Sequence, residues 1–544
     1  MDNISVVVPQ WVPIEQHYFS FDKRSLIAAA FAGLLGFVYL VSFLNEVIFG
    51  FRAPIAGQRS KFEPAWLLRM RFIRGSRTIL SDGYNKFRNT VFKIRRIGAD
   101  VVIIPSKYVD EIRTLTGDKT RGVEPFIKDF CGEITNGMCF LNSDLQNRVV
   151  QQRLTPILGT LAPVMKNELD FALLKEMPGC SETWTETNIN AILAAILSRI
   201  SARVFLGPEE CRNEEWLTAT AEYTDRVFKT GMILRIFPKP IRPLVAPFIP
   251  MYWGLLKNVV TARRVITKIV ESRRSAEKES NGNYEKPKDI LQGMLDGAEG
   301  EEMSLANLSQ RMLILSLASI HTTALTMTQT LYDLCKHPEY FEPIRKELVT
   351  VLREDGGWGK TTLNKLWKLD SLIKESQRFS PVFMLTFQRI FHQSITLSDG
   401  THFPSGTRIA VPTHWMLNDS TYVPGDADPA TFDPFRYSRI REDPAHPENA
   451  QRHMLAMTEP SNMAFGYGRY ACPGRFYAVN EMKMILGHLL LRYDFKFMEG
   501  CSRPKNFTFD SDLYPDRSAR LLVRERPKIE DGIKELLGRT TVKD

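Results

Sequence analysis

The sequence lacks the patterns that mark disulfide-bonded or repetitive proteins. It contains no Cys-x-x-Cys pair, no internal repeat and no cysteine among its first hundred residues. Its seven cysteines are an odd number and lie far apart: Cys131, Cys139, Cys180, Cys211, Cys335, Cys472 and Cys501. This pattern argues against a disulfide framework and for reduced thiols in a cytosolic compartment. A C-terminal Lys-Asp-Glu-Leu signal is also missing, as expected for an end that faces the cytosol.

The composition is that of a large protein with a sizeable core. The chain has 544 residues, 44% of them hydrophobic, which is enough for one catalytic domain and an anchor. The formal net charge of +9 suits a surface that meets anionic lipid or an acidic redox partner. Scattered solvated lysines and arginines explain that total equally well. We expect a monomeric catalytic unit and no nucleic-acid partner.

One long run near the N-terminus carries no charge: residues 25–44 read SLIAAAFAGLLGFVYLVSFL. A helix of this length crosses a hydrocarbon core of roughly 30 Å. A cleaved signal peptide is the alternative, but the run starts late and exceeds a usual signal core. Basic residues follow it from Arg52 to Arg74, so the positive-inside rule places the body in the cytosol.

These features predict a single-pass protein of the endoplasmic reticulum membrane. The expected parts are a lumenal tail (1–24) with a glycosylation sequon at Asn3, a transmembrane anchor helix (25–44), a linker (45–64), a catalytic domain (65–530) and a C-terminal tail (531–544).

Beyond the linker the pattern predicts a mainly α fold with a smaller β part. Short strands are predicted at 101–104, 394–397 and 408–411, with an Asp399-Gly400 turn between the last two. The charged stretch 271–288 predicts an exposed connection between helices. Residues 231–253 alternate prolines with apolar and basic residues, which fits either a segment on a membrane surface or a buried proline-rich loop.

One glycine-rich loop near the C-terminus, FGYGRYACPG at 465–474, carries the strongest chemical signal. Apolar residues at helical spacing follow it to about residue 490. The pattern therefore predicts that Cys472 lies at a helix N-terminus with Pro473 in the first helical position. The helix dipole and free backbone N–H groups there favour a thiolate, the form of cysteine that binds metals. A reduced cysteine without a role is the alternative.

Two further predicted helices carry polar residues in informative positions. Helical spacing over about 304–335 includes ASIHTT at 318–323, where a mid-helix threonine hydroxyl can bend the helix and pass protons. Ordinary packing is the alternative. The next helix, about 363–379, places Glu375 and Arg378 on one face, one turn apart.

Taken in order, ASIHTT, ESQR at 375–378, FDPFR at 432–436 and the cysteine loop resemble the cytochromes P450, which are haem-thiolate monooxygenases. The resemblance implies the P450 fold and a haem whose iron is bound by the Cys472 thiolate. It also implies that Phe465, Gly468 and Gly474 belong to the haem-binding loop.

In the central helix, the resemblance assigns Thr322 to proton relay, with His321 and Thr323 beside it as catalytic residues. Two positions depart from the family pattern. His321 stands where the family usually has an acid, and Ser319 where it usually has glycine. An imidazole could donate to a water chain, but it does not simply take over the role of a carboxylate.

The resemblance further implies a buried ion network of Glu375, Arg378 and Arg436. Arg389 matches an arginine that binds a haem propionate, with surface exposure as the alternative. Tyr470 stands where the family more often has arginine or histidine. A propionate contact there is therefore expected to weaken or to pass to Arg469.

The C-terminal third is most similar to fungal cytochromes P450 of the ent-kaurene-oxidase-like group, which oxidise terpenoid intermediates of secondary metabolism. This implies insertion of one oxygen atom from O2 into an apolar terpenoid or meroterpenoid, with electrons from NADPH through NADPH-cytochrome P450 reductase. The alternatives are a peroxygenase or isomerase that needs no reductase, and a haem sensor or electron carrier in which His321 caps the iron.

Overall fold

The computed structural model describes residues 33, 51–181, 183–280, 283–530 and 532–537. The chain divides into Met1–Arg52 and Ala53–Asp544. The predicted tail with Asn3 and, apart from Gly33, the predicted anchor lie outside the described residues.

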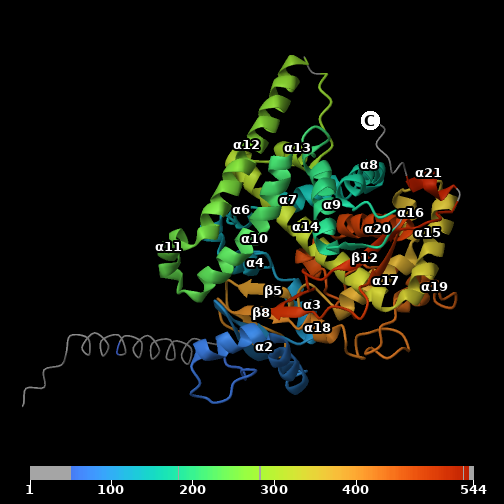
Figure 1. Ribbon diagram of the computed structural model, residues 1–544. Helices are drawn as coiled ribbons and strands as arrows, with labels where there is room; N and C mark the ends of the chain where they lie inside the picture. Colours follow the sequence, from blue (N-terminus) through green and yellow to red (C-terminus); the bar gives the residue numbers. More distant parts are fainter. Residues whose placement is uncertain (1–32, 34–50, 182, 281–282, 531, 538–544) are drawn as a thin grey trace, which may run out of the picture. The chain divides into compact units, whose positions relative to one another are not determined.

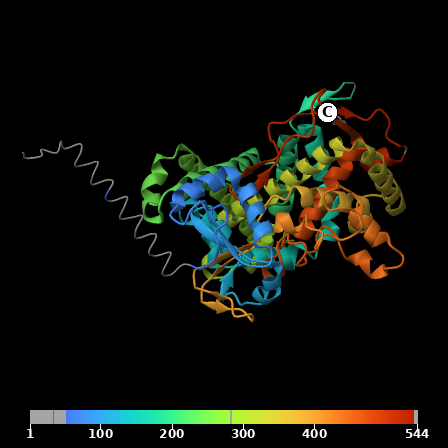
Figure 2. The ribbon, with the colours of Figure 1, turned by 90° about the horizontal axis from the view of Figure 1, so that it is seen from below.

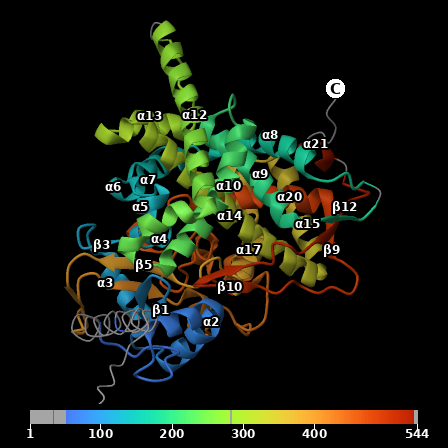
Figure 3. The same ribbon diagram turned by 60° about the vertical axis from the view of Figure 1, so that its left-hand side comes forward.

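Helix α14 (Leu305–Lys336) runs through the middle of this unit, as Figure 3 shows. The helices that pack on it are α9 (Ile189–Leu206), α10 (Glu214–Ile236), α12 (Pro250–Glu279), α17 (Trp367–Phe379) and α20 (Arg475–Arg492). Because neighbours surround it, α14 is buried on nearly every side, as its long apolar pattern requires.

Both ends of α14 follow from local sequence. The Ser304 hydroxyl accepts a hydrogen bond from the backbone N–H of Asn307 at 3.2 Å, which caps the N-terminus. At the other end Pro338 has no N–H to continue the helix, and His337 is the C-cap. The predicted helix over about 304–335 is thus found within one residue at each end.

The other helical segments surround this centre (Figure 1). They are α2 (Ala65–Lys86), η1 (Ser106–Tyr108), α3 (Val109–Arg113), α4 (Glu124–Asp129), α5 (Gly132–Thr135), α6 (Cys139–Asn142), α7 (Leu145–Val149), η2 (Val150–Leu154), α8 (Leu158–Glu176), η3 (Lys239–Ile241), α11 (Arg242–Val245), η4 (Ala246–Phe248), α13 (Ile290–Gly297), η5 (Gly300–Met303), η6 (Pro338–Tyr340), α15 (Phe341–Asp355), α16 (Lys360–Lys365), α18 (Thr413–Met416), α19 (Arg436–Glu442), η7 (Pro447–Gln451), η8 (Gly468–Tyr470) and α21 (Ile533–Leu537).

The β part is smaller and, in the residues that the structure describes, forms four separate sheets. The largest has the order β1-β2-β8-β5-β3, and the others pair β4-β12-β9, β10-β11 and β6-β7. The strands are β1 (Phe92–Arg96), β2 (Ala99–Ile103), β3 (Thr120–Arg121), β4 (Thr185–Thr187), β5 (Thr386–Phe391), β6 (Ile395–Thr396), β7 (His402–Phe403), β8 (Arg408–Val411), β9 (Tyr493–Phe497), β10 (Phe507–Phe509), β11 (Asp512–Tyr514) and β12 (Leu521–Glu525). Helix α2 packs on β1 and β10, and Figure 2 views the molecule from that side. The predicted mainly α fold with a smaller β part is confirmed.

The predicted Asp399-Gly400 turn is found between β6 and β8 in the sequence. It joins β6 to the short strand β7, whereas β8 lies in the five-stranded sheet between β2 and β5. The short β7 forms because Gly400, with φ of +85°, closes a tight turn directly after β6. One local prediction is wrong in part: the charged stretch 271–288 is exposed as predicted, but it is not a connection throughout, because α12 continues to Glu279 with its charged side chains in solvent.

Among the described residues, one helix is long and apolar enough to cross a membrane. It is α9, and 67% of its length is buried inside the protein. Its contacts with α8 and α14 identify it as a core helix.

Candidate active site

Backbone hydrogen bonds shape the cysteine loop. The N–H of Cys472 donates to the carbonyl of Phe465 at 2.7 Å, so the loop closes on itself. Gly466 and Gly468 have φ of +73° and +70°, values that only glycine adopts without strain. A side chain on Gly468 would also collide with Arg113, 2.9 Å away. Gly466 and Gly468 are therefore required by the path of the chain.

The helix after this loop begins later than the sequence pattern predicts. Helix α20 starts at Arg475 with Gly474 as its N-cap, so Cys472 and Pro473 precede it. The bend at Gly474 ends the loop before the helix forms. Burial raises the pKa of the Cys472 thiol, while the backbone N–H groups of Gly474 and Arg475 and the Arg475 charge act in the opposite direction. The helix N-terminus thus favours the thiolate as expected, but burial outweighs it.

One face of α14 is open although the helix is central. Ala318 is exposed in mid-helix, and His321 and Thr322 are partly exposed, whereas Thr323 is buried. The Thr322 hydroxyl donates to the carbonyl of Ala318 at 2.7 Å. Its lone pairs remain available to accept a hydrogen bond from the open side.

His321 is neutral near pH 7 in these surroundings. Burial and the positive charge of Arg517 lower its pKa to about 4. Its Nε2 atom is buried and has no hydrogen-bond partner among the described residues. His321 therefore adds no positive charge to the open face of α14. It also does not replace the acidic side chain that the family usually has at this position.

The structure brings Glu375, Arg378 and Arg436 together, each at most 1% exposed. Arg378 donates to both carboxylate oxygens of Glu375, at 2.9 and 2.8 Å, and Arg436 Nε lies 3.5 Å from Oε1. The remaining guanidinium hydrogens reach backbone carbonyls, among them Pro429 and Ala427 at 2.7 Å each. This ion network is saturated with hydrogen bonds, the condition under which buried charges are tolerated.

Arg389 is equally buried but lacks such a partner. It is 3% exposed, and it donates only to the carbonyls of Gln388 at 2.7 Å and Tyr467 at 3.3 Å. Its Nε has no hydrogen-bond partner, and no carboxylate pairs with it among the described residues. Burial lowers its pKa to about 10.

A β-bulge aims Arg389, and this signal is not visible in the sequence. The pairing of β5 with β8 shifts register between Thr386 and Arg389, and Phe387 has a φ of +50°. Bulges of this kind redirect side chains beside functional sites. The guanidinium then lies 4.7 Å from the centre of the Tyr470 ring.

The other predicted loop residues differ in their exposure. Phe465 is partly buried and packs against the main core, whereas Arg469 is exposed. A side chain built on Gly474 would meet no atom within 4 Å.

These residues fit a haem. A buried guanidinium without a carboxylate suits a propionate, the open face of α14 beside Ala318 leaves room for a flat ring, and Cys472 offers a thiolate ligand. The fit rests on groups that the protein itself leaves unsatisfied or open.

The sequence analysis missed one buried polar group, Glu481 in α20. Its Oε1 accepts hydrogen bonds from Tyr477 at 2.9 Å and Ser201 at 3.4 Å, and Ser201 contacts Ser319 of α14 at 3.1 Å. The signal in the sequence that could have identified it is a single glutamate within the apolar helical run that follows the cysteine loop.

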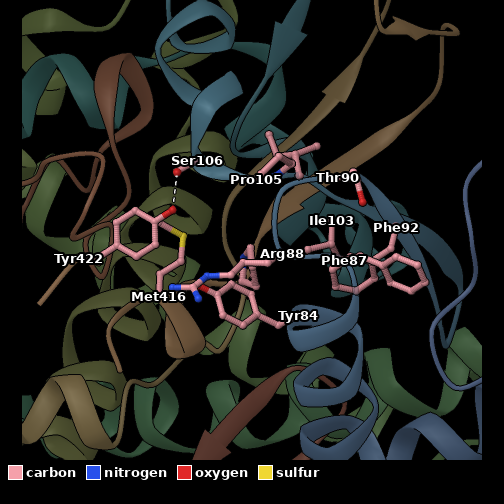
Figure 4. Close-up of a pocket in the computed structure, with 12 residues that line it drawn as sticks. Tyr84, Phe87, Arg88, Thr90, Phe92, Ile103, Pro105, Ser106, Met416 and Tyr422 are labelled. Atoms are coloured by element: carbon pink, nitrogen blue, oxygen red, sulfur yellow. Dashed lines mark hydrogen bonds between the residues drawn. The ribbon is translucent and has the colours of Figure 1, made fainter. Parts of the chain in front are cut away.

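A separate pocket lies between α2, the β1–β2 hairpin and α18 (Figure 4). The hydroxyls of Ser106 and Tyr422 face each other there at 2.8 Å. None of its lining residues is a predicted site residue.

Comparison with known proteins agrees with this geometry. The model of the cytochrome P450 family matches residues 70–522. Ent-kaurene oxidase P450-4 of Gibberella fujikuroi is 56% identical over 93% of this chain and 98% of its own length. A cytochrome P450 monooxygenase of Emericella nidulans is 46% identical over 92% of this chain and 93% of that protein.

A solved structure, the retinoic acid-bound cyanobacterial CYP120A1, shares the fold with a TM-score of 0.64 at 18% identity, covering 88% of this chain and all of that one. The predicted P450 fold is thus confirmed. With a family model over most of its length and relatives above half identity, the chain belongs to the cytochrome P450 family and is a monooxygenase of that family.

Proposed function

We propose that this protein inserts one oxygen atom from O2 into an apolar terpenoid or meroterpenoid intermediate of fungal secondary metabolism, with electrons from NADPH through a membrane-bound reductase. The substrate class is carried over from relatives whose names state it: three ent-kaurene oxidases, each 56% identical to this chain.

Haem, held by a cysteine thiolate as in the rest of the family, supplies the oxygen-activating chemistry when bound. We assign its binding to Cys472 as ligand and to Arg389 as propionate partner. The glycines of the cysteine loop let the backbone approach without side chains in the way.

Thr322 is the residue we assign to proton transfer at the open face of α14. Its hydroxyl hydrogen is fixed on the Ala318 carbonyl, so the oxygen presents its lone pairs to a water or substrate on that face. Thr323 is buried beside it and supports the packing of the helix.

The reductase is proposed to dock on the cysteine side of the protein. Arg469 is exposed there and offers a positive charge to an acidic partner. Arg475 is partly exposed and is engaged with the carbonyls of Ala456 and Cys472 at 3.1 and 3.0 Å. Lys483, further along α20, is 2% exposed and pairs with Asp370 at 2.5 Å, so it is unavailable to a partner.

Membrane attachment is supported by exposed apolar side chains in two segments. In residues 231–253, Leu244 is 70% exposed, Phe248 85% and Trp253 58%. At the start of the second unit, Phe62 is 81% and Trp66 63% exposed. Groups of this kind are costly in water and suit the lipid interface. We propose that this unit rests on the endoplasmic reticulum membrane and faces the cytosol.

The observation that carries the proposal is the pairing of a haem-type cysteine loop with an open threonine face on α14. The test is expression with a reductase in yeast microsomes, feeding of diterpene and meroterpene scaffolds under isotopically labelled O2, and mass spectrometry. We expect NADPH-dependent products that carry one labelled oxygen. Turnover with peroxide but without NADPH, or products without the label, would reject the proposal.

A further inference from the structure

Arg475 is the first residue of α20, and its side chain turns back over the cysteine loop. Its Nη1 donates to the carbonyl of Cys472 at 3.0 Å, and its Nε donates to the carbonyl of Ala456 at 3.1 Å. The guanidinium carbon lies 4.4 Å from the centre of the Phe476 ring. Two hydrogen bonds and a ring contact therefore fix the guanidinium beside the cysteine that we assign as the haem ligand.

No acidic side chain neutralises this arginine. It forms no ion pair with a carboxylate among the described residues, and both of its hydrogen-bond acceptors are neutral backbone carbonyls. The two other long cationic side chains of α20 are paired: Lys483 with Asp370 at 2.5 Å and Arg492 with Asp170 at 3.3 Å. The charge of Arg475 is thus left uncompensated at the end of α20 that faces the cysteine loop.

The group that this charge can stabilise is Cys472 itself. When Cys472 binds iron as a thiolate, negative charge lies on the same residue whose carbonyl Arg475 holds. Ferrous haem-thiolate carries one more negative charge than the ferric form, so a positive charge fixed nearby favours the reduced state. Arg475 is partly exposed, and solvent screening reduces this effect without removing it.

We propose that Arg475 is a positioning residue whose charge acts through Cys472 to raise the reduction potential of the haem iron. The step that it favours moves one electron from the reductase, which is oxidised, to ferric iron, which is reduced. No bond forms or breaks, and Arg475 itself keeps all its protons. This role rests on the proposed function for the electron donor, and it does not depend on the identity of the substrate.

The first test is a redox titration of the purified holoprotein with a chemical reductant. We expect Arg475→Gln to shift the equilibrium toward ferric haem about tenfold, which is about 59 mV for a one-electron couple. Arg475→Lys keeps the charge and loses only the forked geometry, so its equilibrium should stay within about threefold of the wild type. An unchanged potential in Arg475→Gln, or an equal shift in Arg475→Lys, would mean that charge is not the cause.

Arg469 provides a matched control. It lies three residues before Cys472, as Arg475 lies three residues after it, but it is exposed and its side chain makes no hydrogen bond among the described residues. Arg469→Gln should shift the same equilibrium by less than about threefold, because an exposed charge is screened by solvent. A tenfold shift in Arg469→Gln as well would show that any cation on this face has the effect, and would overturn the role of the contact with Cys472.

The second test measures the C–O stretch of the reduced carbon monoxide complex by infrared spectroscopy. Without the Arg475 charge the sulfur donates more electron density, so the iron passes more density to carbon monoxide and the stretch falls. We expect a lower frequency in Arg475→Gln and wild-type values in Arg475→Lys and Arg469→Gln. If Arg475→Gln does not retain haem, Arg475→Met removes the same charge and keeps the apolar stem over Phe476. An unchanged stretch in the neutral variant rejects the proposal.

Failure of this proposal can be told apart from failure of the proposed function. Neither measurement uses NADPH, a reductase or a substrate. A wild-type protein without NADPH-dependent product rejects the proposed function, while the potential and the stretch still decide the role of Arg475. Product formation by the wild type, together with a wild-type potential in Arg475→Gln, rejects the role of Arg475 alone.

Discussion

This protein has two centres of buried charged groups, and they differ in how many of those groups have a partner within the protein. In the closed centre, Glu375, Arg378 and Arg436 bind one another, and backbone carbonyls take up their remaining donors. The open centre is formed by Cys472 and by Arg389, which donates to the Tyr467 carbonyl of the cysteine loop at 3.3 Å. No carboxylate pairs with Arg389 among the described residues.

The difference distinguishes architecture from chemistry. A saturated network costs little to keep and holds α17 and the segment before α19 in one arrangement. An unsatisfied buried group costs stability. A bound haem would complete the open centre, with a propionate for Arg389 and iron for Cys472.

Removing the ligand of the open centre should have the largest effect on activity. We expect Cys472→Ala to abolish monooxygenation while the protein stays folded, because the bonds that close the loop, from its N–H to Phe465 and from Arg475 to its carbonyl, are made by its backbone. Circular dichroism and the absorbance of the reduced carbon monoxide complex would check this. Cys501→Ala, at an exposed free cysteine, is the matched control and should keep full activity. Retained turnover in Cys472→Ala would show that Cys472 is not the haem ligand.

Opening the closed centre should have the largest effect on stability. Glu375→Ala leaves two buried guanidinium groups without a countercharge, and we expect a loss of about 3–5 kcal/mol in the free energy of unfolding. Denaturant titration measures it. The control is Glu215→Ala, which breaks an exposed pair with Arg264 (60% and 65% exposed) and should cost less than about 1 kcal/mol. Similar losses in both variants would erase the distinction between buried and exposed pairs.

Within the open centre, burial should decide which arginine matters for haem. Arg389→Leu removes a desolvated donor, and we expect haem to be retained about 10- to 100-fold less tightly. Arg469→Ala removes an exposed charge and should change retention by less than about threefold. Haem transfer to apomyoglobin, followed by absorbance, compares the two. A larger loss of haem in Arg469→Ala than in Arg389→Leu would instead assign the propionate contact to Arg469, beside Tyr470.

The contrast also explains how far the sequence could be interpreted. The closed centre and the cysteine loop depend on fixed spacing along one or two elements, so Glu375 with Arg378 and Phe465 with Cys472 could be recognised from the residues alone. The chain from Ser319 through Ser201 to Glu481 joins three helices that are distant in sequence. No local pattern records that proximity.

Two other features could not be predicted from the sequence because they depend on local backbone geometry. The αL conformation of Phe387 and the bulge that aims Arg389 depend on the pairing of β5 with β8. The start of α20 at Arg475 instead of Pro473 follows from the bend at Gly474, which helical periodicity does not report.

The smallest expected effect is the pH dependence that His321 contributes. Its pKa is about 4 in the folded protein, against an ordinary value of 6.5, because burial disfavours the charged ring. Between pH 6.5 and 4 the unfolded chain binds a proton at this position and the folded protein does not, so stability rises with pH across that window. His321→Leu should flatten the rise by roughly 1–3 kcal/mol in denaturant titrations at pH 4.5 and 7. His414 and His488, whose pKa values are lowered to about 3, keep the remaining slope. An unchanged slope would mean that the His321 ring keeps its ordinary pKa of 6.5 in the folded protein and is not desolvated there.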